Sequence, residues 1–130
     1  MNMPKSDHRM VVLAVEDEPI VRMSMADFLD DAGFKVFEAV NADEAIALLQ
    51  ARSDVQVVVT DIEMPGSMNG LEMARVVRVR WPSVGIVVTS GRVRPGSHDL
   101  MDGVVFLSKP YLPDAVIGAI RRVAEPKQPD

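Results

Sequence analysis

Short apolar runs alternate along this chain with longer stretches whose apolar residues recur every three or four positions. The runs are typical of strands buried on both faces of a sheet, and the strands that they predict cover residues 10–15, 55–60, 85–89 and 104–107. Residues 34–39 alternate instead between apolar and polar side chains, which favours a more exposed strand. Because helical stretches separate these strands, the pattern predicts an α/β fold with a doubly wound, five-stranded parallel sheet.

Helical spacing of apolar residues predicts helices after Pro19, after Asn41, around residues 71–79 and after Pro113. Pro19 suits the first position of a helix, where its missing N–H does no harm. Asn41 and Glu44, three residues later, resemble a capping box at the start of the second helix. Helices of this kind between buried strands are expected on both faces of the sheet.

One segment interrupts this rhythm, and the ends of the chain are polar. Residues 91–103 are rich in glycine and proline, so a fourth helix there is expected to be short or irregular, around residues 97–101. The 130 residues suffice for one domain with a core over about residues 10–124. Residues 1–9 and 125–130 are expected to be flexible tails.

Composition narrows the classes of partner. The formal net charge of -5 argues against a nucleic-acid surface, because phosphate binding needs an excess of lysine and arginine. The chain has no cysteine, which is consistent with a reducing cytoplasm. No apolar run approaches the roughly 20 residues that a membrane span needs. We therefore expect a cytoplasmic domain with neither a nucleic-acid nor a membrane partner.

Polar residues stand at the ends of four of the predicted strands. They are Glu16-Asp17, Asp61, Thr89-Ser90 and Lys109. In a doubly wound sheet the strand ends meet at a crevice that is the usual ligand site. Crowded carboxylates repel one another unless a cation joins them, and a hard ion such as Mg²⁺ prefers their oxygens. Taken singly, Asp61 could merely cap a helix, but four such coincidences at one edge favour a site.

In this order and at these strand ends, the motifs make the chain resemble a bacterial response-regulator receiver domain, and in particular the single-domain chemotaxis receivers. The resemblance runs from about Val11 to Val123. The motifs that carry it are Glu16-Asp17-Glu18-Pro19, Asp61-Ile62-Glu63-Met64-Pro65-Gly66, Asn69-Gly70, Thr89-Ser90 and Lys109-Pro110. It implies the flavodoxin-like strand order 2-1-3-4-5.

The resemblance also implies a phosphorylation site with a bound metal ion. Asp61 would accept a phosphoryl group from a histidine kinase or a histidine phosphotransfer protein, and with an ordinary pKa near ~4 it would need no general base. Mg²⁺ or Mn²⁺ would be held directly by Asp17, Asp61 and the backbone carbonyl of Glu63. Glu16 would reach the ion through water. Lys109 would pair with Asp61 before transfer and with a phosphoryl oxygen afterwards.

A switch is implied as well. The Thr89 hydroxyl would turn toward the phosphoryl group, and Phe106 occupies the position of the family's switch aromatic, although its role as a plain core residue stays open. The peptide bond between Lys109 and Pro110 is expected to be cis. Glu63 and Gly91 stand two residues beyond Asp61 and Thr89, where they are expected to tune the lifetime of the phosphorylated state.

Two alternatives to a phosphorylatable switch remain at this stage. One is an interaction module that keeps the fold and is never phosphorylated, signalling to a downstream protein that the sequence does not identify. The other is a Mg²⁺-dependent phosphohydrolase, which usually carries a second Asp where this chain has Glu63. We expect a signalling switch with no independent enzymatic substrate.

The loop from Met64 to Gly70 is one residue longer than the family's usual spacing.

Overall fold

A computed structural model describes residues 8–92 and 103–124, and within them it has one five-stranded parallel sheet and four helices. The strands are β1 (Val11–Val15), β2 (Lys35–Ala39), β3 (Val57–Asp61), β4 (Gly85–Ser90) and β5 (Val104–Ser108). The helices are α1 (Pro19–Asp31), α2 (Ala42–Ala51), α3 (Gly70–Arg80) and α4 (Pro113–Ala124). The strand order β2-β1-β3-β4-β5 confirms the expected doubly wound sheet.

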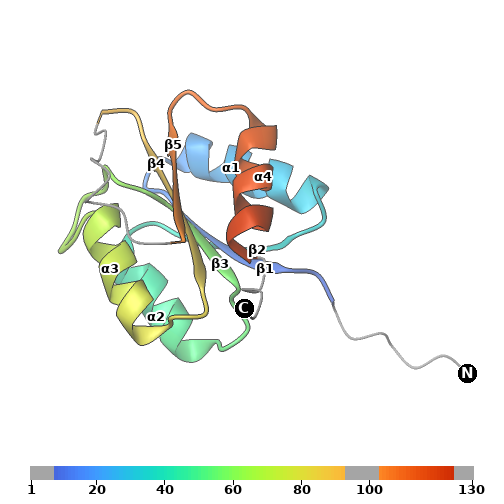
Figure 1. Ribbon diagram of the computed structural model, residues 1–130. Coiled ribbons are helices and arrows are strands. Elements are labelled where there is room, and N and C mark those ends of the chain that lie inside the picture. The colour runs from blue at the N-terminus through green and yellow to red at the C-terminus, as the bar shows by residue number, and fades with distance from the viewer. Residues whose placement is uncertain (1–7, 93–102, 125–130) are drawn as a thin grey trace, which may run out of the picture.

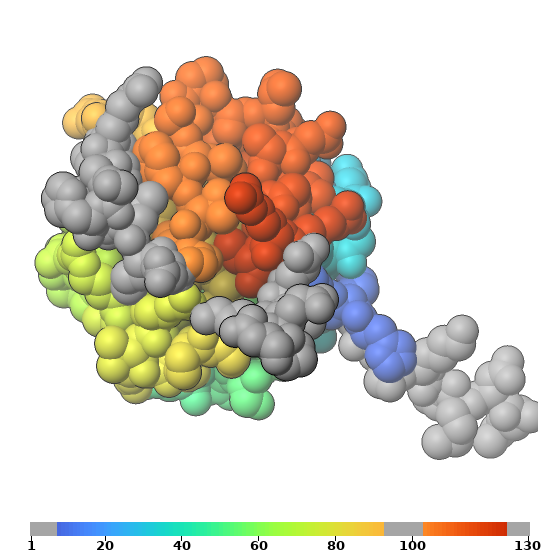
Figure 2. All heavy atoms as spheres, viewed as in Figure 1, coloured from blue at the N-terminus to red at the C-terminus, as the bar shows by residue number. Residues whose placement is uncertain are grey.

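The sheet is the middle of three layers, with α1 and α4 on one face and α2 and α3 on the other (Figure 1). Successive residues of a strand point to opposite faces, so Val12 packs with Ile120 of α4 while Leu13 packs in the layer that contains Val77 of α3. Seen from the same side, β5 and α4 form one continuous surface, coloured orange to red in Figure 2. The strands predicted from apolar runs are therefore the ones whose two faces are covered by helices.

The direction of the connections places the crevice. From β1 the chain passes through α1 to β2 on one side, and then through α2 to β3 on the other side of β1. The strand order thus reverses between β1 and β3, and ligands of such sheets bind outside the carboxyl ends of the strands at this point. The acids predicted as a site lie at this point, because Glu16 and Asp17 follow β1 and Asp61 is the last residue of β3.

Some local expectations need correction. β3 begins at Val57 rather than at residue 55, although Val55 is still buried. The side chain of Asn41 accepts the N–H of Glu44, but the Glu44 carboxylate accepts the N–H of Val40 rather than that of the cap residue. A reciprocal capping box occurs instead at the start of α3, between the two residues Asn69 and Glu72.

Other expectations fall outside what the structure covers. The short helix expected around residues 97–101, residues 1–7 of the tail expected at 1–9, and the tail expected at 125–130 lie outside the described residues. Among the helices of residues 8–92 and 103–124, none is long and apolar enough to cross a membrane.

Candidate functional site

The first acids of the site follow β1 and are held by backbone and side-chain bonds. Glu16 is 1% exposed, and its N–H donates to the carbonyl of Ala39 at 3.0 Å. One of its carboxylate oxygens, Oε2, accepts the N–H of Glu18 at 3.1 Å. Arg22, one turn into α1, donates to the Glu16 carbonyl at 3.0 Å and pairs with Glu38 at 3.3 Å. Arg22 was not singled out from the sequence, because its role depends on contacts with two different strand ends.

Asp61 ends β3 and is 5% exposed. Its Cα lies in direct register with that of Thr89 on β4, and the following N–H, from Ile62, donates to the Thr89 carbonyl at 2.9 Å. The start of α3 closes against the same point, since the N–H of Gly70 donates to the Ile62 carbonyl at 3.0 Å. A Cβ at position 70 would overlap the Asp61 carbonyl oxygen, so glycine permits this close approach.

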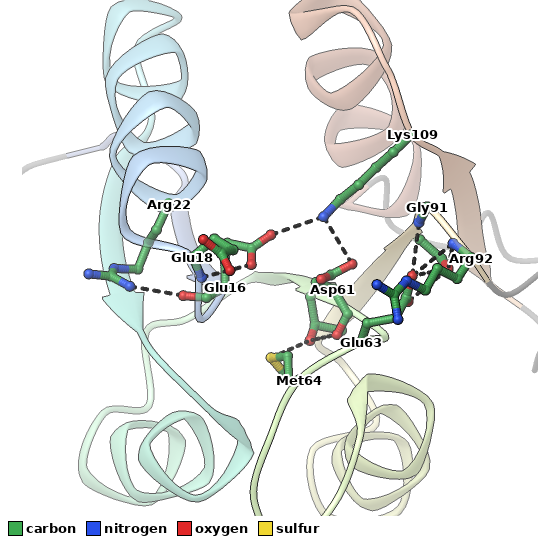
Figure 3. Close-up of polar contacts among 11 residues, drawn as sticks. Glu16, Glu18, Arg22, Asp61, Glu63, Met64, Gly91, Arg92 and Lys109 are labelled. Atoms are coloured by element: carbon green, nitrogen blue, oxygen red, sulfur yellow. Dashed lines mark hydrogen bonds and ion pairs between the residues drawn. The ribbon is translucent and has the colours of Figure 1, made fainter.

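Lys109 comes from the opposite side of the crevice, after β5. Its ammonium Nζ lies 3.2 Å from Oε1 of Glu16 and 3.2 Å from Oδ1 of Asp61, so it bridges the two carboxylates (Figure 3). The N–H of Lys109 donates to the carbonyl of Ser90 at 2.8 Å, which ties the end of β5 to the end of β4. The Lys109–Pro110 peptide is cis, as predicted. The pairing with Glu16 was not predicted.

The three groups change one another's ionisation. Burial and the nearby charge of Glu16 raise the pKa of Asp61 to about 6, although Lys109 partly offsets this. The ordinary pKa near ~4 that was expected of Asp61 is therefore corrected. Burial disfavours the charged form of Lys109, but Asp61 and Glu16 outweigh burial and raise the pKa of Lys109 above its usual value. At pH 7 most molecules thus carry an ionised Asp61 opposite a charged ammonium.

The acids form a cluster that can hold a cation. Glu16, Asp17 and Asp61 each offer a carboxylate oxygen, and these oxygens all lie within 4.8 Å of one another. Glu16 and Asp61 are buried and Asp17 is half-buried. Oxygen ligands at this spacing suit a hard divalent ion, which would relieve the repulsion that raises the pKa of Asp61.

Thr89 is buried beside this cluster. Among the side-chain atoms of the described residues, its hydroxyl oxygen and Oδ1 of Asp61 are the buried ones with no hydrogen bond, although Oδ1 has the ion pair with Lys109. An unpaired buried hydroxyl is costly, typically about 1–3 kcal/mol. Phe106 is partly buried against the core on the α2 and α3 side.

The side chain of Glu63 contacts the end of β4, which the sequence did not indicate. Its carboxylate accepts hydrogen bonds from Ser90, Gly91 and Arg92 at the end of β4, and these bonds outweigh burial and lower its pKa. The sequence singled out its backbone carbonyl as a metal ligand and its position as one that tunes the phosphorylated state, but it did not indicate these side-chain contacts. No sequence pattern indicates a contact between positions 27 to 29 residues apart.

Known proteins share both the sequence and the fold. The family model for the response regulator receiver domain matches residues 12–121. The hydrogenase transcriptional regulatory protein HoxA of Cupriavidus necator is 36% identical over an alignment of 126 residues, and the match covers 92% of this chain and 25% of HoxA. Response regulator Rre1 of Synechocystis sp. is 36% identical over 125 residues, covering 90% of this chain and 52% of Rre1. The chain thus spans only part of these curated relatives.

Solved structures agree with this match. The crystal structure of a response regulator receiver protein from Sinorhizobium medicae WSM419 has a TM-score of 0.84 and 28% identity, and the likeness covers 90% of this chain and 95% of that one. Chemotaxis protein CheY4 of Vibrio cholerae has a TM-score of 0.77 and 28% identity over 88% of this chain and 98% of that one. Because the family model covers most of the chain and solved receivers share its sheet, this chain belongs to the response regulator receiver domains of two-component signalling systems.

Proposed function

We propose that Asp61 of this receiver accepts a phosphoryl group from a phosphohistidine on a sensor kinase or a histidine phosphotransfer protein. The observation that carries the proposal is the position of Asp61 at the centre of the crevice. It is buried, paired with the Lys109 ammonium and grouped with Asp17 and Glu16. A buried carboxylate with an adjacent cation and a metal-binding neighbour has the equipment for phosphoryl transfer, which depends mainly on positioning and electrostatics.

The acid cluster supports a Mg²⁺ or Mn²⁺ site. Asp17, Asp61 and the carbonyl of Glu63 would hold the ion. Glu16 already uses Oε1 for Lys109 and Oε2 for the N–H of Glu18, which favours a contact through water for this residue. When bound, the ion supplies positive charge against the phosphoryl oxygens. Oδ1 of Asp61 is buried and has no hydrogen bond besides its ion pair with Lys109, and this oxygen and the raised pKa of Asp61 both support a cation here.

The residues of this chain can carry the transfer without a general base. An oxygen of ionised Asp61 forms a bond to phosphorus while the bond from phosphorus to the donor imidazole nitrogen breaks, and the electron pair leaves with that nitrogen. Lys109, held between Glu16 and Asp61, can turn its ammonium to a phosphoryl oxygen. The unpaired hydroxyl of Thr89 can donate to another. Phe106 would respond to that movement as a switch residue.

The signalling role follows from these groups. The receiver family is not an enzyme family, and we propose that this chain has no independent substrate: phosphorylation changes which downstream protein it binds. An added phosphoryl group brings charge into a site already rich in carboxylates, so Thr89 and Lys109 are the groups that would respond. We propose a cytoplasmic location, because a kinase that uses ATP works there, and no role for nucleic acid or a membrane.

Phosphotransfer from the source organism's histidine kinases tests this proposal. We expect at least one phosphorylated kinase to transfer its label to the wild-type chain, so that the kinase loses label as the chain gains it. The same kinase should leave the Asp61→Asn variant unlabelled. Asp27→Asn is the matched control. Asp27 is an exposed carboxylate of α1 that lies near Ser24 and Asp30 and is not part of the acid cluster. If no kinase labels the chain, the interaction module that is never phosphorylated is favoured.

Metal addition gives a second expected result. Mg²⁺ at a hundred times its dissociation constant should raise the free energy of unfolding by about 2.7 kcal/mol, because the ion binds the folded chain alone. Asp17→Asn should lose most of this gain, since it removes a ligand of the cluster. Thermal unfolding with and without Mg²⁺ measures the difference. An equal gain in Asp17→Asn and wild type would contradict the assigned metal site.

A further inference from the structure

The carboxylate of Glu63 is the acceptor of a compact set of hydrogen bonds at the end of β4. Ser90 Oγ lies 2.8 Å from each of its two oxygens, and the N–H groups of Gly91 and Arg92 donate to Oε1 at 3.0 and 2.9 Å. The N–H of Arg92 also lies 3.2 Å from Ser90 Oγ. Figure 3 shows Glu63 reaching from the loop after β3 toward Gly91 and Arg92. We call this set, Glu63 with Ser90, Gly91 and Arg92, the Glu63 clasp.

Successive N–H groups and a hydroxyl that converge on one point make a pocket for an anion. In this chain the anion is internal, because it is the side chain of Glu63. Hydrogen bonds to an ionised acceptor are roughly twice as strong as neutral ones. The clasp therefore holds the segment that leaves β4 in one position relative to the loop that follows Asp61.

We propose that Glu63 is a positioning residue whose clasp on residues 90–92 opposes the rearrangement of Thr89 toward a group bound on Asp61. The inference rests on the proposed function. It adds a residue that sets the free-energy difference between the unliganded arrangement of Thr89 and the arrangement with a group bound on Asp61. It also gives a physical basis for the expectation that Glu63 and Gly91 tune the phosphorylated state: they act through each other.

Thr89 lies beside Asp61 and lacks a hydrogen-bond partner. Its buried hydroxyl has no hydrogen bond, and its Cα is in register with that of Asp61, so an oxygen of a group bound on Asp61 would supply the missing partner. Ser90 is the next residue, is 1% exposed, and is held on two sides: its hydroxyl by Glu63 and its carbonyl by the N–H of Lys109. A shift of the Thr89 backbone toward Asp61 therefore has to strain or break the bond between Ser90 and Glu63.

The same geometry separates this role from a direct one. The Glu63 carboxylate is occupied by donors from residues 90–92, so it is not free to orient water or a phosphoryl oxygen. If Glu63 acts through the clasp, removing the Ser90 hydroxyl has the same effect as neutralising Glu63. If Glu63 acts by its charge alone, only the change at Glu63 matters.

The test compares Glu63→Gln, Ser90→Ala and the double variant, with Asp27→Asn as the control for loss of one charge. The first arm needs no ligand: amide hydrogen exchange of Gly91 and Arg92 should be about 3- to 10-fold faster in each single variant than in the wild type. The second arm is binding of beryllofluoride with Mg²⁺, an analogue of the phosphoryl group. Each single variant should bind this analogue about 3- to 10-fold more tightly. The clasp stabilises the unliganded state alone, so its loss destabilises that state relative to the bound one.

The double variant should gain less than the product of the two single gains, because both changes break the same bonds. Unchanged or weaker analogue binding in Glu63→Gln and Ser90→Ala would overturn the proposal, as would an effect of Glu63→Gln that Ser90→Ala does not share. Failure of the wild type to bind the analogue would instead remove the proposed function itself and the coupling with it. The exchange arm would still report whether the clasp holds residues 91 and 92.

Discussion

Replacing Asp61 with asparagine is expected to make the metal-free protein more stable at pH 7, by about 1–2 kcal/mol, while it removes the phosphoacceptor. Burial and the charge of Glu16 raise the pKa of Asp61 to about 6, so the folded chain pays to keep this carboxylate ionised at neutral pH. Asparagine removes that charge and leaves Lys109 paired with Glu16. Denaturant unfolding in the presence of a chelator measures the difference.

The stability difference between Asp61→Asn and wild type is expected to depend on pH. A carboxyl whose pKa is higher in the folded chain than in the unfolded chain stabilises the fold at low pH, where both forms are protonated. That contribution is present below about pH 4 and is lost as the pH rises through about 6. The advantage of Asp61→Asn over wild type should therefore grow between pH 4 and pH 7. The exposed control Asp27→Asn should stay within about 0.5 kcal/mol of wild type. An Asp61→Asn variant that is less stable than wild type at pH 7 would contradict the described crowding.

Replacing Gly70 with alanine is expected to destabilise the protein by about 1–3 kcal/mol and to disturb the loop that follows Asp61. A Cβ at this position would overlap the Asp61 carbonyl oxygen and lie 2.8 Å from the carbonyl carbon of Asp61 and 2.9 Å from the Cα of Ile62. All three atoms belong to the backbone, which cannot yield as a flexible side chain does. Relief of the clash would move α3 away from β3, so weaker Mg²⁺ binding should accompany the loss of stability.

Gly118 provides the matched comparison, because it is exposed within α4 and a Cβ added there meets nothing within 4 Å. Gly118→Ala should stabilise the protein by about 0.5–1 kcal/mol, since alanine loses less backbone freedom than glycine in a helix. The two alanine substitutions should thus shift the denaturant midpoint in opposite directions. A Gly70→Ala protein as stable as wild type, with unchanged Mg²⁺ binding, would show that α3 does not need this close approach.

The fold could be predicted from the sequence because its signals are local. Strands β1, β3 and β4 are buried on both faces, and each contains a run of at least three apolar residues in the sequence. The order of the strands came from the resemblance to receivers rather than from the pattern. The capping box was expected at Asn41, but within the described residues it is complete at Asn69 instead. One of its two side-chain bonds depends on how the chain enters the helix, and before α2 it is the N–H of Val40 that reaches Glu44.

The site could be predicted only in part, for a different reason. Strand ends identify Asp61 and Glu16 as neighbours, since all parallel strands of the sheet end at one edge. The choice of partners is a matter of three-dimensional geometry: Lys109 pairs with Glu16 across 93 residues of sequence. The raised pKa of Asp61 also depends on burial and on the distance to Glu16, which no spacing encodes. Arg22 and the contacts of the Glu63 side chain with residues 90–92 were missed on the same grounds.

We expect Asp61 to take up a phosphoryl group, and the mass of the intact protein reports this uptake. The wild-type chain is incubated with Mg²⁺ and a small acyl-phosphate donor, in parallel with a receiver of known activity. We expect the wild type to gain the mass of one phosphoryl group, to lose this gain when a chelator replaces Mg²⁺, and to show none in Asp61→Asn. An unmodified wild-type mass beside a labelled reference receiver, or equal labelling of Asp61→Asn, would contradict the claim.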